Sequence, residues 1–185
     1  MAKDTSRVTI HMVSSLDGFV TKKDGSVSWM ESQDNYEKGM TLTDEDVEAF
    51  LKTIDCYVMG SKTYELALKL GWPYGDVPVV VLTHRELPVD RKSVELYSGD
   101  LVELVNNRLK PKYKSIWMVG GPTLARDFIR LNLADDVRIT IAPVILGDGM
   151  PFFDHIDGEH TLHLKDVTVY KNGMVELWYE SSPQL

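Results

Sequence analysis

Met118-Val119-Gly120-Gly121-Pro122-Thr123-Leu124 is the stretch that decides how this chain is interpreted. An apolar run over 115–119 stops at two glycines, and Pro122 stands where a helix would begin. Apolar side chains then recur at helical spacing, as Leu124, Phe128 and Leu131. The pattern predicts a buried strand, a tight turn and a helix N-terminus, whose unpaired N–H groups suit a phosphate. Many strand–glycine–helix joints bind nothing, so a purely structural role is the alternative for this stretch alone.

Composition excludes several classes of protein. The 185 residues are 43% hydrophobic and 26% charged, which suits a single globular domain over 1–185. A net charge of −8 argues against a nucleic-acid partner, because no basic stripe stands ready to neutralise phosphates. No apolar run approaches the ~20 residues that cross a membrane, and residues 1–7 lack a signal-peptide core. The single cysteine, Cys56, allows no internal disulfide, so we expect a cytoplasmic protein without a membrane partner.

Strand and helix patterns alternate along most of the chain. We expect strands over 8–13, 56–59, 78–82, 94–97, 115–119 and 137–144. Helices are expected from Thr43, after Gly60, near Leu101 and from Pro122 to about Leu133. Thr43 with Asp46 resembles a capping box, and an apolar stripe follows at positions 47, 50, 51 and 54.

The C-terminal part has a different character. Asn172-Gly173 lies between two β-rich runs, 164–170 and 174–180, and this is a strong hairpin signal. The continuously apolar run over 79–82 indicates a strand that is covered on both faces. The sequence therefore predicts a three-layer α/β domain with a mixed central sheet, closed by a C-terminal antiparallel hairpin.

Three of the predicted strands end in glycine-rich or polar segments: Gly60-Ser61-Lys62-Thr63, Leu82-Thr83-His84-Arg85 and Val119-Gly120-Gly121-Pro122. The carboxyl ends of parallel strands meet at one edge of a sheet and form its ligand crevice. A ligand with a pyrophosphate and one separate phosphate, as in NADPH, would use all three segments. The alternatives are that Ser61 and Thr63 cap a helix and that 83–85 is a solvated loop. No Gly-x-Gly-x-x-Gly follows the first strand, which disfavours a Rossmann dehydrogenase.

Five segments, taken in order, resemble the dihydrofolate reductase superfamily. The likeness is greatest to the C-terminal reductase domain of the bifunctional riboflavin-biosynthesis deaminase–reductase and to stand-alone proteins built like it, over residues 8–178. The zinc ligands of the deaminase half are missing from the sequence, and no metal site is expected. The segments are Ser15-Leu16-Asp17-Gly18, Val58-Met59-Gly60-Ser61-Lys62-Thr63-Tyr64, Val80-Val81-Leu82-Thr83-His84-Arg85, Val119-Gly120-Gly121-Pro122-Thr123-Leu124 and Ala142-Pro143-Val144-Ile145-Leu146-Gly147-Asp148-Gly149.

The resemblance implies an enzyme, an NADPH-dependent reductase like 5-amino-6-(5-phosphoribosylamino)uracil reductase. Such an enzyme transfers hydride to a small heterocyclic or ribosylamino substrate. It also implies a cis bond between Gly120 and Gly121, and a homodimer in which Ile145, Phe152 and Phe153 serve either the interface or the core. The implied cofactor contacts are Met12 and Val13 at the nicotinamide, Gly60, Ser61, Lys62 and Thr63 at the phosphates, Leu82, Thr83, His84 and Arg85 near the 2′-phosphate, and Val119, Gly120, Gly121, Pro122, Thr123 and Leu124 around the pyrophosphate and nicotinamide.

The substrate side is defined less well. Asp17 is the predicted catalytic residue, anchoring a hydroxyl or relaying a proton, and an Asx turn before Gly18 is the alternative. Trp29 and Trp72 are predicted to bind substrate, with core or loop packing as the alternative for Trp29.

One departure concerns the substrate. Dihydrofolate reductases hold the pterin with a carboxylate after the first strand, and Glu31, Asp34 and Glu37 give no convincing match here. Dihydrofolate reductase and a non-catalytic NADPH-binding protein are therefore the alternative functions.

Overall fold

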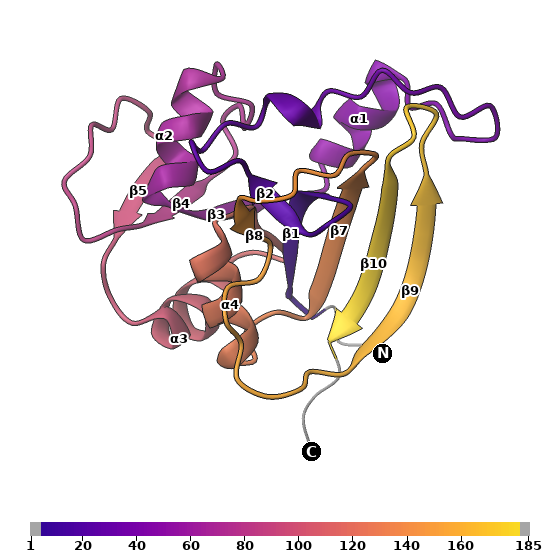
Figure 1. The fold of residues 1–185 in the computed structure, drawn as a ribbon. Coiled ribbons are helices and arrows are strands. Elements are labelled where there is room, and N and C mark those ends of the chain that lie inside the picture. Colours follow the sequence, from indigo (N-terminus) through magenta and orange to yellow (C-terminus); the bar gives the residue numbers. More distant parts are fainter. Residues whose placement is uncertain (1–4, 182–185) are drawn as a thin grey trace.

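An eight-stranded mixed sheet forms the centre of the molecule (Figure 1). The computed structural model describes residues 5–181. The strands of this sheet are β1 (Arg7–Ser15), β3 (Cys56–Gly60), β4 (Val79–Leu82), β5 (Val94–Tyr97), β6 (Ser115–Met118), β7 (Asp136–Ala142), β9 (Leu162–Val169) and β10 (Val175–Ser181). Their spatial order is β5-β4-β3-β6-β1-β7-β10-β9. The helices are η1 (Ser28–Met30), α1 (Asp44–Leu51), α2 (Ser61–Lys69), α3 (Leu101–Glu103), η2 (Leu104–Leu109) and α4 (Pro122–Arg130).

Parallel pairing runs from β5 through β4, β3, β6 and β1 to β7, and the C-terminal strands close the sheet in antiparallel fashion. The predicted hairpin is confirmed: β9 and β10 pair across a turn in which Gly173 has φ +79°. A positive φ costs glycine little, which explains why Asn-Gly marks this turn.

Two hydrophobic cores lie on opposite faces of the sheet. On one face, η2 and α4 bury Leu104, Val105 and Phe128 against β1, β3 and β6. On the other, α2 buries Tyr64 and Ala67 against Tyr57 and Trp117. Val80 belongs to the first core while Val79 and Val81 belong to the second, so β4 is covered on both faces as its continuous apolar run predicts. These layers give the three-layer α/β fold.

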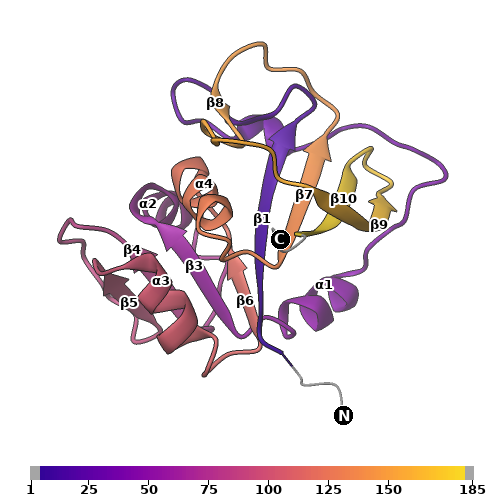
Figure 2. The ribbon, with the colours of Figure 1, turned by 90° about the horizontal axis from the view of Figure 1, so that it is seen from below.

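Helix α1 begins as predicted but packs differently from its pattern. The backbone N–H of Asp46 donates to Thr43 Oγ1 at 3.1 Å and that of Thr43 donates to Asp46 Oδ2 at 2.9 Å, which completes the capping box. The apolar stripe predicts a buried face; Ile54, just after the helix, is 3% exposed, yet Val47, Phe50 and Leu51 remain about 40% exposed. Figure 2 shows α1 on the opposite side of the sheet from α4. There Phe50 meets the ring of Trp117 and the guanidinium of Arg138, so the helix covers a surface that is partly aromatic and partly charged.

The sequence did not predict a small second sheet, in which β2 (Phe19–Thr21) pairs with β8 (Met150–Pro151). The backbone N–H of Phe152 donates to the carbonyl of Gly18 at 2.7 Å, which holds the segment after β7 against the end of β1. Phe152 is 3% exposed and Phe153 packs against the same core, so both serve the core, whereas Ile145 is 69% exposed. Within residues 5–181, no helix is long and apolar enough to cross a bilayer.

Candidate functional site

The three predicted loops follow strands that are neighbours in the sheet. β4, β3 and β6 lie side by side, with Gly60 beside Leu82 and Val58 beside Met118. β1 comes next, with Ile10 beside Met118. Strands are about 4.8 Å apart, so the row of strand ends from β4 to β1 spans roughly 14 Å. The structure thus brings together the segments that the sequence assigned to one ligand.

Two glycine segments touch at the middle of this row. The backbone N–H of Gly60 donates to the carbonyl of Gly120 at 2.8 Å. Gly120 has φ +136°, and a Cβ added there would lie 2.9 Å from Thr63 Oγ1 and 3.7 Å from Met12 Sδ. The Gly120–Gly121 bond is cis, as expected. Segments from β1, β3 and β6 therefore meet at one point, where only glycine fits at position 120.

Both helices that start at this row begin without a side-chain cap. Gly60 is the N-cap of α2 and Gly121 that of α4, and no side chain of the described residues caps either one. Ser61 and Thr63 do not cap α2, which removes that alternative. The first N–H groups of a helix carry partial positive charge and need an acceptor. Helix α1 supplies its own acceptor, whereas α2 and α4 leave two adjacent N-termini suited to an anion.

The end of β4 carries the exposed residues His84 and Arg85. Arg85 Nη2 lies 2.9 Å from Glu65 Oε2 of α2, and its backbone N–H donates to Thr83 Oγ1 at 3.0 Å. The hydrogen bond from Arg85 lowers the pKa of Glu65. Exposed ion pairs of this kind are weak, so a phosphate can compete with Glu65 for the guanidinium. The segment is therefore exposed, as expected for a solvated loop, but the ion pair with Glu65 holds Arg85 beside α2.

Asp17 ties a loop to the end of β1. Its Oδ1 accepts from Ser15 Oγ at 2.6 Å and from the backbone N–H of Leu146 at 3.0 Å, and its Oδ2 accepts from that of Gly147 at 2.7 Å. The Ser15 hydrogen bond, followed by these backbone bonds, lowers the pKa of Asp17 to about 2. Asp17 is therefore ionised near neutral pH and holds no proton to donate. Its catalytic role stays a prediction, and its contacts are those of a loop anchor.

We expect Asp17→Asn to lower the Tm at pH 7 because the amide replaces a carboxylate that accepts three hydrogen bonds. The pKa of Asp17 is lower in the folded protein than its unfolded value of 3.8, so the ionised carboxylate stabilises the fold at pH values above 3.8. This stabilisation is lost as the pH falls through about 2. The difference in Tm between wild type and variant should thus shrink from pH 4 to pH 2, as measured by thermal unfolding. Asp24→Asn, in the next turn, is the control. A difference independent of pH would contradict the assignment.

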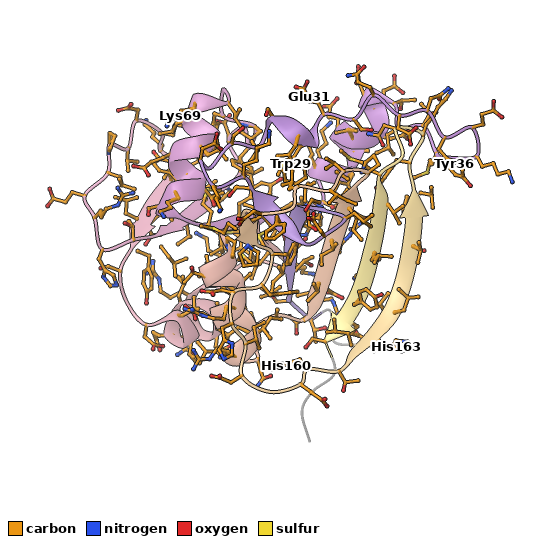
Figure 3. All side chains as sticks on the ribbon, in the orientation of Figure 1. Trp29, Glu31, Tyr36, Lys69, His160 and His163 are labelled. Carbon is orange, nitrogen blue, oxygen red and sulfur yellow. The ribbon has the colours of Figure 1, made fainter. Side chains whose placement is uncertain are left out.

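The predicted tryptophans lie in different surroundings. Trp29 points from η1 towards the sheet while Glu31 points away from it (Figure 3), and Trp29 is 9% exposed. Its Nε1 is buried without a hydrogen-bond partner among residues 5–181. Trp72 donates from Nε1 to the carbonyl of Gly75 at 2.9 Å and packs edge-on against Tyr64 and Tyr74. Trp72 thus has the contacts of a core residue, and substrate binding by either tryptophan stays a prediction.

Sequence reasoning missed a polar cluster under α1. Glu176 of β10 is 7% exposed, and it receives a hydrogen bond from Arg138 of β7. Thr140 Oγ1 lies 3.3 Å from Glu176 Oε2 and 3.4 Å from His11 Nε2 of β1. Burial raises the pKa of Glu176, but the hydrogen bonds and charges of His11 and Arg138 outweigh it and lower the pKa overall. The sequence signal that could have revealed this cluster is that charged residues recur at every second position of a β-rich run, as at Asp136 and Arg138.

Two surface hollows lie away from this row. One is lined by Arg130, Asn132, Asp157, Gly158, Glu159 and His160, and the other by Asp76, Asp90, Arg91, Lys92 and Ser93. The candidate site is therefore identified by converging donors at the strand ends rather than by the depth of a hollow.

Taken together, the sheet order, the two uncapped helices and the paired glycines define a reductase-like domain of dihydrofolate-reductase architecture. The chain belongs to the RibD C-terminal domain family, whose sequence model matches residues 6–176. RibD is a riboflavin biosynthesis protein, and membership of this family places the chain among reductase-like oxidoreductases.

Sequence relatives include two uncharacterised proteins of Bacillus subtilis (strain 168). YwjB is 31% identical over 169 residues, covering 86% of this chain and 89% of its own. YyaP is 27% identical over 191 residues, covering 94% of each chain.

Solved structures share the fold. A structure described as that of a riboflavin biosynthesis protein from Shewanella sp. PV-4 superposes with a TM-score of 0.80 at 25% identity, covering 96% of this chain and 99% of that one. The deaminase/5-amino-6-(5-phosphoribosylamino)uracil reductase of Thermotoga maritima superposes with a TM-score of 0.68 at 16% identity. This second match covers 97% of this chain and 58% of that one, and it shows the fold alone.

Proposed function

We propose that the protein is an NADPH-dependent reductase that transfers hydride to a ribosylaminopyrimidinone or a related small heterocycle. The order of strand ends along the sheet carries this proposal. From β4 to β1 the row offers Arg85, then the N-terminus of α2, then that of α4, then Met12 and Val13. NADPH presents its parts in the same order: the 2′-phosphate, the pyrophosphate and the nicotinamide. Family membership supports a reductase of this type.

The fit of the cofactor rests on features of this chain. Two uncapped helix N-termini receive a pyrophosphate, and Gly120 keeps the backbone open where a side chain would meet Thr63. NADPH, when bound, supplies the hydride, while the protein supplies position and excludes water. Backbone groups of Met12 and Val13 orient the nicotinamide. Because Asp17 is ionised, the proton is expected from water, and any relay through Asp17 should appear as a fall in kcat in Asp17→Asn without loss of NADPH affinity.

We expect Arg85→Ala to weaken NADPH binding roughly tenfold or more while NADH binding changes little. The guanidinium makes a charge-assisted hydrogen bond to a phosphate that only NADPH carries, and such bonds are among the stronger ones. Kd values for both dinucleotides, measured by fluorescence titration, give the ratio. Arg130→Ala, an exposed arginine beside Asp157, is the control. An unchanged preference would show that the 2′-phosphate is recognised elsewhere.

The rival function is a nucleotide-binding protein without turnover, and it is favoured by the contacts of Asp17, which are those of a loop anchor. A single assay separates the two: the protein is incubated with NADPH, and nicotinamide absorbance is followed on adding dihydrofolate and then the ribosylaminopyrimidinone. Oxidation of NADPH with the second substrate supports the proposal. Saturable NADPH binding without oxidation by either supports the rival, and oxidation by dihydrofolate alone would indicate a dihydrofolate reductase.

A second copy of the chain is the proposed partner. By strand register, Leu164 and Val167 of β9 share a sheet face with Leu177 and Tyr179 of β10 and with the α4 core. Leu164 is 47% exposed and Val167 46%, and no helix of the described residues lies over β9 in Figure 1. Two such faces can stack as in a β-sandwich, with isologous contacts.

We expect Leu164→Lys to convert a dimer to a monomer, because it places a charge in the proposed apolar interface. The mass in solution is measured by light scattering. Leu70→Lys, at a leucine 66% exposed after α2, is the control and should stay dimeric. A monomeric wild type, or a dimeric Leu164→Lys variant, would contradict this interface.

A further inference from the structure

A buried carboxylate lies on the sheet face that α1 covers, one step from the row of strand ends. Glu176 is paired in register with Thr140, and Arg138 with His11. These four side chains therefore come from three adjacent strands and share one face. His11 is two residues before Val13 on β1, so the two side chains lie about 7 Å apart on the same face. The cluster thus borders the position expected for the nicotinamide.

The two oxygens of Glu176 are used unequally. Oε1 accepts a direct hydrogen bond from Arg138 Nη2. Oε2 has Thr140 Oγ1 at 3.3 Å and His11 Nε2 at 3.5 Å, both longer than the 2.7–3.2 Å usual for hydrogen bonds. A buried carboxylate oxygen normally takes short, charge-assisted bonds. Oε2 is therefore an acceptor with capacity for a further donor.

Arg138, in contrast, has a hydrogen-bond donor without an acceptor. Its Nε is buried and has no hydrogen-bond partner within residues 5–181. The guanidinium carbon lies 5.0–5.4 Å from the ring centres of Phe50, Trp117 and Trp178, so aromatic faces surround it. Buried N–H groups are nearly always paired in folded proteins, and this one calls for an acceptor. A spare acceptor and a spare donor thus lie on neighbouring side chains.

Aromatic side chains border this cluster, and two of the side chains around it are partly exposed. Trp117 lies 4.9 Å from the His11 ring, and Phe50 of α1 meets Trp117 edge-on at 5.2 Å. Phe50 is 39% exposed and the His11 side chain 25% exposed, so α1 does not seal this face. Aromatic walls of this kind favour planar heterocycles.

We propose that Glu176 and Arg138 recognise the amide edge of a pyrimidine ring, the carboxylate accepting from a ring N–H and the guanidinium donating to the adjacent carbonyl. The inference rests on the proposed function, because it sets the ring beside the nicotinamide. Glu176 then takes, from the opposite end of the chain, the role for which Glu31, Asp34 and Glu37 gave no match. The substrate class is a planar heterocycle with an N–H beside a carbonyl, and an N-alkylated ring is excluded.

The test compares two probes, 5,6-diaminouracil and its 1,3-dimethyl derivative, which lacks the ring N–H groups. Titration calorimetry gives the Kd of each for the wild type, Glu176→Gln and Glu180→Gln, and NADPH affinity is measured separately. Glu180 is the matched control because it lies on the same strand and face but pairs with Arg7. We expect the wild type and Glu180→Gln to prefer 5,6-diaminouracil roughly ten- to hundredfold, the range for a hydrogen bond to a charged group. Glu176→Gln keeps only a neutral amide oxygen as acceptor, so its preference should fall below about tenfold while its NADPH affinity is kept.

Several results would overturn the inference: no binding of 5,6-diaminouracil to the wild type, equal binding of both probes to the wild type, or a preference in Glu176→Gln as large as that of the wild type. The comparison of probes on the wild type needs no variant, so it can still overturn the inference if Glu176→Gln does not fold. If the wild type does not bind NADPH but prefers 5,6-diaminouracil, with that preference reduced in Glu176→Gln, the proposed function alone is refuted.

Discussion

Gly120→Ala is expected to lower the affinity for NADPH at least about tenfold and to reduce the free energy of unfolding by about 1–3 kcal/mol. The residue has φ +136°, which side-chain-bearing residues rarely adopt, and the new Cβ would lie 2.9 Å from Thr63 Oγ1. Thr63 is β-branched and stands in the first turn of α2, so it cannot move aside freely. Relief of the contact must displace the segment that joins the two helix N-termini. Fluorescence titration and urea unfolding measure the two effects.

Gly60→Ala is the matched control for stability. Gly60 has φ −83°, and its added Cβ would lie 3.8 Å from the nearest atom, in ordinary van der Waals contact. Its free energy of unfolding should stay within about 0.5 kcal/mol of the wild type. Equal stability of Gly120→Ala and wild type would show that the backbone at position 120 is not constrained as described.

Phe128→Ala should lower the free energy of unfolding by about 3–5 kcal/mol, the usual cost of removing a fully buried aromatic ring. Phe128 is 0% exposed and lies in the core between α4 and the sheet, so its removal leaves a cavity beneath the helix whose N-terminus forms part of the site. Urea unfolding with an unchanged m-value measures the loss as a change in stability alone.

Leu131→Ala provides the comparison, since Leu131 ends the same helix but is 46% exposed. Its cost should stay near or below about 1 kcal/mol. Similar losses in the two variants would mean that α4 is not anchored through Phe128.

The parts of the fold that follow local rules could be predicted from the sequence. Asn172-Gly173 indicates the hairpin because turn chemistry acts over two residues, and Gly121-Pro122 marks the start of α4 for the same reason. The meeting of the three loops also followed, because parallel strands place their carboxyl ends at one edge.

What the sequence did not reveal depends on register between distant strands. Glu176 reaches Thr140 and His11 only because β10 pairs with β7 and β7 with β1, a choice that no local pattern encodes. The apolar stripe of α1 indicates a helix but not the partly charged surface beneath it. Asp17 likewise contacts Leu146 and Gly147, which lie 129 and 130 positions further along the chain. The residues next to Asp17 indicate only an Asx turn, so its role as a loop anchor could not be predicted.

The bare N-termini of α2 and α4 have a consequence for the lifetime of the protein in a cell. A bound dinucleotide would act as the missing cap of both helices, so it would bind the native state alone and shift the folding equilibrium. At a concentration one hundred times its Kd, such a ligand adds about 2.7 kcal/mol. If the proposed dinucleotide binds there, the amount of this protein that escapes proteolysis would follow the supply of that dinucleotide in the cell.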